Sequence, residues 1–206
     1  MNLKDLTLVD YIDAVDSNMP APGGGSVAGL VGALGVALAR MAGHLSVEKK
    51  KFYESSKQKQ NKFLLAFKEV VRYKDELVYC IDEDAISYKA VIDAYKTKEK
   101  LQIQNALYYA AYVAMDMQNI SKHALELIEK LISLCNKNLF SDLEAGAILL
   151  VATNEIASFN LKANAYLLED EDQKNKYLEN SKKVLLEATK IKKRIHNKIE
   201  KEKNPK

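Results

Sequence analysis

The residue with the clearest chemical meaning in this chain is Asp84. It belongs to a stripe at about 3.5-residue spacing that predicts one face of a long helix: Phe63, Phe67, Val70, Lys74, Leu77, Ile81, Asp84, Tyr88, Val91 and Tyr95. A carboxylate among apolar side chains must be paired, hydrogen-bonded or protonated, and burial raises its pKa. Asp84 is therefore a candidate general acid or base near neutral pH. The alternative is a structural ion pair, or an edge position at which Asp84 reaches solvent beside Glu83.

Two asparagines form a second candidate group. Asn160 and Asn164 are one helical turn apart and share a face of a segment that is apolar on most sides. Two carboxamides offer the donors and acceptors that suit a flat heterocycle. The alternative is that both side chains only join neighbouring helices.

A glycine-rich segment supplies a third candidate group. Two prolines and three glycines lead into Ser26, which stands where an N-cap is expected before an apolar run. The amide groups of Gly23, Gly24, Gly25 and Ser26 could cradle an anion or a carbonyl oxygen. The run that follows, up to Gly43, is rich in glycine and alanine. Each interior glycine costs roughly 1 kcal/mol relative to alanine, so the helix should lie very close to another backbone or to a ligand.

Other readings of the glycine-rich segment are poorly supported. The Gly-Lys-Ser/Thr ending of a phosphate-binding P-loop is absent, and no strand precedes the glycines as in a dinucleotide-binding fold. The helical stretch without charge, 26–39, is shorter than the roughly 17 to 25 residues that a membrane span needs. We therefore expect no membrane partner.

Composition excludes several other classes of protein. A net charge of +3, with 31 basic and 28 acidic residues interspersed, does not favour nucleic-acid binding. His44, His123 and His196 are dispersed, so no metal site is expected, and a Ser-His-Asp hydrolase would need a strand-turn-helix context. Cys80 and Cys135 have no CxxC spacing and indicate buried thiols in a reducing compartment. Aspartates interrupt any signal-peptide core near the N-terminus, so we expect a cytoplasmic protein.

The elements that must position these groups are helices. Prolines occur only at 20, 22 and 205, and strand-like alternation is hard to find. Ser141, followed by Asp142 and with Glu144 three residues on, reads as the capping box of one helix. Short links favour an all-α, up-and-down antiparallel bundle in one domain, residues 1–206, with a frayed tail at about 203–206. The expected helices are 6–17, 27–44, a third opened by the polar segment 46–51 and reaching about 95, 98–135, 141–168 and 171–201.

Taken together, these motifs resemble the cyclodeaminase/cyclohydrolase family. That family comprises the C-terminal half of formiminotransferase-cyclodeaminase and the stand-alone bacterial methenyltetrahydrofolate cyclohydrolases. The resemblance covers almost the whole chain. Its motifs here are Pro20-Ala-Pro-Gly-Gly-Gly-Ser-Val-Ala28 with Gly32-Ala-Leu-Gly35 and Leu45-Ser46, Asp82-Glu-Asp-Ala-Ile-Ser-Tyr88, 136–142 ending in Ser141-Asp142, and Asn160-Leu-Lys-Ala-Asn164. The chain departs from the family pattern at Lys96-Thr97-Lys98, where Leu-Pro is usual, at Ala114, near which a proline is usual, and at Cys135, where glycine is common.

The resemblance implies an all-helical homodimer that acts on one-carbon units of tetrahydrofolate, without a metal or a permanently bound cofactor. One reaction converts 5-formiminotetrahydrofolate into 5,10-methenyltetrahydrofolate and ammonia, and the other opens the methenyl ring with water to give 10-formyltetrahydrofolate. It implies that Asp84 shuttles the proton and that Asn160 and Asn164 bind folate heteroatoms. It further implies that 23–26 holds a polar part of the ligand, that Ser141 and Asp142 support the site, and that Lys50 and Lys51 meet the glutamate tail.

Two rival functions keep the scaffold without the chemistry. In a helical interaction module, the small-residue helix would serve only packing, and Asp84 would form an interhelical ion pair. In a folate carrier, the ligand would bind without turnover. Convergence of Asp84, Asn160 and Asn164 on one cleft would favour the enzyme.

Overall fold

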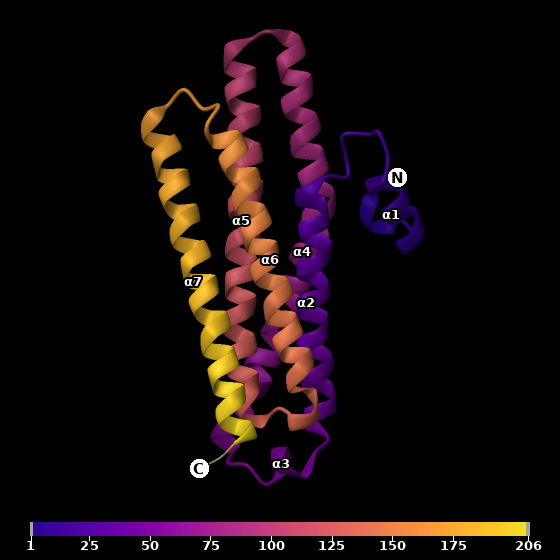
Figure 1. Ribbon diagram of the computed structural model, residues 1–206, viewed down its shortest axis with the longest axis vertical. Coiled ribbons are helices and arrows are strands. Elements are labelled where there is room, and N and C mark those ends of the chain that lie inside the picture. The colour runs from indigo at the N-terminus through magenta and orange to yellow at the C-terminus, as the bar shows by residue number, and fades with distance from the viewer. Residues whose placement is uncertain (1, 205–206) are drawn as a thin grey trace.

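The computed structural model describes residues 2–204, which form helices joined by short links (Figure 1). No β-strand occurs within this range, so the all-α prediction is confirmed. The elements in chain order are η1 (Leu3–Asp5), α1 (Leu8–Val15), α2 (Gly24–Val47), α3 (Lys50–Tyr53), α4 (Lys57–Thr97), α5 (Lys100–Leu131), η2 (Ile132–Leu134), η3 (Lys137–Leu139), α6 (Phe140–Ala165) and α7 (Glu171–Lys203), where η marks a short 3₁₀ turn.

The long helices run alternately up and down the molecule (Figure 1). Helix α2 packs against α4 and α6, and α5 packs against the same two helices, so these four enclose the main core. Helix α7 covers the outer side of α5 and α6. The short helix α1 lies beside the bundle and buries only one side chain, that of Tyr11 (Figure 1). This arrangement places the ends of α2, α4 and α6 where their polar side chains can meet.

The third expected helix is divided in two. Helix α3 ends at Tyr53, and Ser56 caps the new helix α4 by accepting a hydrogen bond from the backbone N–H of Lys59. The Gln60 amide fixes the bend, because its Nε2 donates to three carbonyls of the preceding turn, at 3.0, 3.3 and 2.9 Å. At the other end of the chain α7 continues to Lys203, inside the tail expected to be frayed, and residues 205–206 lie outside the described range.

Both serines predicted as N-caps lie inside their helices instead. Gly23 is the N-cap of α2, and the Ser26 side chain bonds to Asp84 rather than to its own helix. Leu139 precedes α6 without a capping side chain, and the nearby Asn136 side chain caps η3 instead. The predicted capping box at Ser141 is therefore wrong.

The small-residue helix approaches other backbones closely, as predicted. A Cβ added to Gly29 would lie 2.9 Å from a carbonyl oxygen of α4, and one added to Gly35 would lie 2.8 Å from the carbonyl oxygen of Gly146 in α6. Contacts this short leave no room for a side chain. By length and composition alone α2 could cross a membrane, yet 56% of the window that meets this test is buried within the protein.

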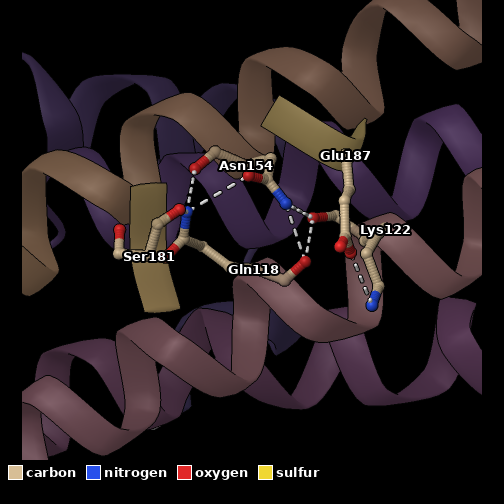
Figure 2. Close-up of polar contacts among 6 residues, drawn as sticks. Gln118, Lys122, Asn154, Ser181 and Glu187 are labelled. Atoms are coloured by element: carbon tan, nitrogen blue, oxygen red, sulfur yellow. Dashed lines mark hydrogen bonds and ion pairs between the residues drawn. The ribbon is translucent and has the colours of Figure 1, made fainter. Parts of the chain in front are cut away.

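A buried polar network joins α5, α6 and α7 (Figure 2). Gln118 and Asn154, both fully buried, exchange hydrogen bonds: Gln118 Nε2 donates to Asn154 Oδ1 at 3.1 Å, and Asn154 Nδ2 donates to the Gln118 carbonyl at 2.7 Å. The carbonyl of Ser181 in α7 accepts a further bond from Gln118 at 3.4 Å, and Lys122 pairs with Glu187 at the edge. Because these groups pair only in one alignment, the network specifies how α7 docks.

Candidate active site

A cavity of about 420 Å³ opens where α2 begins, between α4 and α6; we call it the Asp84 cavity. Its polar lining brings together most of the residues that the sequence singled out: Gly23, Gly24 and Gly25 from the start of α2, Asp84 from α4, and Asn160 and Asn164 from α6. Pro20, Ala21, Ser87 and Tyr88 complete one side. Three segments far apart in sequence therefore converge on one cleft.

The Asp84 carboxylate is held by α2 and α6. Oδ2 accepts hydrogen bonds from the Ser26 backbone N–H at 2.9 Å and from the Ser26 hydroxyl at 3.1 Å. Oδ1 accepts a longer bond, 3.4 Å, from Asn160 Nδ2. The helix N-terminus does bind an anion, as the glycine-rich segment suggested, but that anion is the protein's own carboxylate.

Gly25 permits this approach. A Cβ added to Gly25 would lie 1.8 Å from Asp84 Oδ1 and 2.4 Å from Asn160 Nδ2. Only a residue without a side chain lets the carboxylate and the amide close over the first turn of α2.

The environment of Asp84 shifts the pKa of its carboxyl upward. Burial raises the pKa of this carboxyl above its usual 3.8, and the hydrogen bonds from Ser26 and Asn160 only partly oppose the shift. A carboxyl with a raised pKa is better suited to accept and return a proton. No cationic partner accompanies Asp84 among its hydrogen-bond donors in residues 2–204, so the alternative of a structural ion pair loses support.

The two asparagines differ in their role. Asn160 reaches the carboxylate directly, whereas the Asn164 Nδ2 donates back to the Asn160 carbonyl at 2.9 Å. Both line the Asp84 cavity. Asn160 thus holds the Asp84 carboxylate, whereas Asn164 bonds within α6.

Four predicted site residues lie at the far end of the bundle. Lys50 and Lys51 belong to α3, past the C-terminus of α2, where Lys51 pairs with Glu202 at 3.4 Å. Counted along α2 from Ser26 to Val47, this end lies about 32 Å from Asp84. Ser141 and Asp142 open α6, about 27 Å along the axis from Asn160. Within one chain, none of the four lines the Asp84 cavity.

The sequence did not reveal the contribution of the N-terminal segment. Asp82, two residues before Asp84, accepts backbone hydrogen bonds from Leu3 at 2.6 Å and Lys4 at 3.4 Å, which anchors η1 on α4. The buried Tyr11 hydroxyl has no hydrogen-bond partner within residues 2–204, and burial with the charges of Asp84 and Asp82 raises its pKa to about 12. An apolar stripe identifies the face of one helix but does not show which distant segment covers it.

One histidine has acidic neighbours that the sequence did not predict. His196 Nδ1 lies 2.6 Å from Glu144 Oε1, and Glu200 completes a group whose ligand atoms lie within 4.8 Å of one another. The Lys203 ammonium pairs with both carboxylates, 2.9 Å from Glu200 and 3.6 Å from Glu144. The arrangement is therefore an exposed ion-pair cluster between α6 and α7.

Comparison with known proteins decides the family. Residues 7–183 match the family model described as formiminotransferase-cyclodeaminase. The chain belongs to this family. A solved formiminotetrahydrofolate cyclodeaminase from Thermotoga maritima is 30% identical and superposes with a TM-score of 0.86, over 97% of this chain and 98% of that one.

Two curated relatives show how this family is organised. A methenyltetrahydrofolate cyclohydrolase from Methylorubrum extorquens is 28% identical over 202 residues, which are 94% of this chain and 95% of the relative. A formimidoyltransferase-cyclodeaminase from Mus musculus is 26% identical over 196 residues, 91% of this chain but only 36% of the relative. The chain therefore spans about a third of the longer cyclodeaminase and nearly all of the cyclohydrolase.

Proposed function

We propose that this member of the formiminotransferase-cyclodeaminase family acts on the N5–C–N10 bridge of tetrahydrofolate. It hydrolyses 5,10-methenyltetrahydrofolate to 10-formyltetrahydrofolate, converts 5-formiminotetrahydrofolate into 5,10-methenyltetrahydrofolate and ammonia, or does both. The observation that carries the proposal is the Asp84 carboxyl, partly buried in a cavity of about 420 Å³ and oriented by Ser26 and Asn160. The relatives named for each of these two activities support it.

Asp84 serves either reaction as a proton shuttle. In cyclohydrolysis, the carboxylate takes a proton from the water that attacks the bridge carbon and delivers it to N5 as the carbon–N5 bond breaks. The remaining hydroxyl proton passes to solvent as the formyl carbonyl forms. In cyclodeamination, it takes the proton from N10 as that nitrogen attacks the formimino carbon, and returns it to the departing amine. A single carboxyl with a raised pKa suits both directions of transfer.

The other groups of the cavity orient the substrate. The Asn164 amide and the first-turn amides of Gly24 and Gly25 offer hydrogen bonds to pterin heteroatoms beside the bridge. Gly23 leaves space at the entry to this turn. The roles of Ser141 and Asp142 in supporting the site remain predictions that rest on the family resemblance.

The test follows the ultraviolet absorbance of 5,10-methenyltetrahydrofolate mixed with purified protein, beside a parallel run with 5-formiminotetrahydrofolate. Loss of the chromophore faster than the spontaneous rate identifies a cyclohydrolase, and its appearance from the formimino compound identifies a cyclodeaminase. Asp84→Asn, which keeps size and shape, should lower kcat by roughly 10²- to 10⁴-fold. Ligand binding without turnover in the wild type would favour a carrier, and no binding would favour an interaction module.

We also propose that the protein is a cytoplasmic homodimer acting on folates that carry one or more glutamates. The support for a dimer is α1, which exposes an apolar face to solvent with Leu8 66% and Ile12 55% exposed. Light scattering should give twice the chain mass, and Leu8→Glu with Ile12→Glu should halve it if α1 forms the contact. Both cysteines are free and buried, which fits a reducing compartment.

A further inference from the structure

A second cavity adjoins the Asp84 cavity. It has a volume of about 480 Å³ and lies between α4 and the N-terminal segment; we call it the α4 groove. Pro20, Ala21 and Tyr88 line both cavities, so the two lie on either side of these residues. A ligand seated in one cavity can therefore contact the residues that border the other.

The floor of the α4 groove is a single face of α4. Its lining residues on that helix follow helical spacing from Asp82 to Lys96. The apolar members Ile86 and Ile92 are 52% and 39% exposed, and Leu3 and Met19 from the N-terminal segment contribute the opposite wall. An exposed apolar surface between two walls suits a flat aromatic ring.

The end of the α4 groove near the C-terminus of α4 carries basic side chains. Lys89 and Lys96 extend from α4 on either side of Asp93, and both contact its carboxylate, Lys96 at 2.7 Å. These two ammonium groups hold the pKa of Asp93 at about 2, so the carboxylate stays charged between them. Asp82, the other acidic residue of the groove, is already bonded to backbone N–H groups and to Lys4. One carboxylate between two exposed lysines leaves donors available to a further anion.

We propose that the α4 groove binds the aminobenzoyl-glutamate arm of the folate, with the ring between Ile86 and Ile92 and the glutamate carboxylates on Lys89 and Lys96. The proposal rests on the proposed function, which places the pterin and the one-carbon bridge at Asp84. Lys89 and Lys96 lie about 7.5 and about 18 Å beyond Asp84 along the helix axis but on another side of α4, so the arm passes Tyr88, which lines both cavities, to reach them.

This assignment replaces the one suggested by the family resemblance. Lys50 and Lys51 lie past the opposite end of α2 from Asp84. Within one chain, neither lysine lines the Asp84 cavity or the α4 groove. Two groups of lysines therefore compete for the glutamate, and they can be tested separately.

The experiment compares KM for 5,10-methenyltetrahydrofolate with KM for its pteroate counterpart, which ends at the benzoate and lacks the glutamate. Lys89→Gln with Lys96→Gln should raise KM for the folate roughly threefold to tenfold and leave KM for the pteroate nearly unchanged. Asp93→Asn should lower KM for the folate, because it frees both lysines. Ile92→Ser should raise KM for both compounds, because both carry the ring.

Two further double variants complete the design. Lys59→Gln with Lys68→Gln removes two exposed charges from α4 outside both cavities, and KM for the folate should stay at the wild-type value. Lys50→Gln with Lys51→Gln tests the competing lysines. If that variant raises KM for the folate while the Lys89/Lys96 variant does not, the proposal is overturned.

Binding without turnover separates this proposal from the proposed function. Calorimetry with p-aminobenzoyl-glutamate alone should show binding that the Lys89/Lys96 variant weakens, even if neither folate is turned over. If the wild type turns folate over but the Lys89/Lys96 variant keeps wild-type KM values, the groove assignment fails by itself. If sedimentation shows instead that the Lys89/Lys96 substitutions break up an oligomer, the α4 groove is a contact between two copies of the chain, and the proposal also fails.

Discussion

Gly25→Ala is the most informative substitution at this site, because the structure shows how far the Asp84 carboxylate must move. The added Cβ would lie 1.8 Å from Asp84 Oδ1, whereas an ordinary contact begins near 3.4 Å, so the carboxylate must shift by 3.4 − 1.8 = 1.6 Å. A displacement of about 1 Å in a reacting group can cost about 10²-fold in rate. We therefore expect kcat to fall at least about 100-fold.

Gly24→Ala is the matched control. It adds the same methyl group one residue earlier, yet the nearest atom to the new Cβ is Ile156 Cγ2 at 3.7 Å, an ordinary contact. Neither glycine has a positive φ, so the comparison isolates space from backbone strain. Gly24→Ala should keep wild-type kcat and gain slightly in stability, since alanine favours the helix.

The assay is loss of methenyl absorbance at saturating substrate, with urea unfolding measured on the same samples. Overpacking at Gly25 should lower the free energy of unfolding by about 1–3 kcal/mol, which leaves the native state populated. A folded Gly25→Ala protein with near-wild-type kcat would refute the placement of Asp84 against the first turn of α2. Equal losses in both glycine variants would refute it too, because the cause would then be helix propensity.

Three other perturbations probe the site and the fold. Asn160→Ala removes a hydrogen bond that lowers the pKa of Asp84, so this pKa should rise further. The acidic limb of the pH profile of kcat/KM should then move to higher pH. If the limb does not move, Asn160 does not influence the Asp84 carboxyl. Asn154→Ala removes both side-chain hydrogen bonds between Asn154 and Gln118 from the core and should lower the free energy of unfolding in urea by about 1–3 kcal/mol, while kcat stays close to wild type. Lys98 ends α4 at φ 58°, in the left-handed region, so Lys98→Gly should raise the free energy of unfolding by roughly 0.5–1 kcal/mol; a loss would show that the lysine side chain contributes there.

Local rules in the sequence predicted the helices and the chemical groups. The scarcity of proline and the 3.5-residue stripes determine that the chain is helical, and they place Asp84 on an inward face of α4 and both asparagines on one face of α6. The crowding of glycines in α2 predicted close approach, which Gly29 and Gly35 confirm. All of these inferences relate residues within one helix, where a fixed rise and rotation set the geometry.

Contacts between helices were decided only by the tertiary structure. Ser26 and Asp84 are 58 residues apart, and only the docking of α2 on α4 turns an expected helix cap into the donor that orients the carboxylate. The N-terminal segment likewise lies over α4 only in the folded chain, where Asp82 accepts a hydrogen bond from the Leu3 backbone N–H. Helical periodicity says which way a side chain points, but the register between helices follows from packing of the whole core. The sequence therefore determined the reactive groups of this protein, and the tertiary structure decided which of them meet.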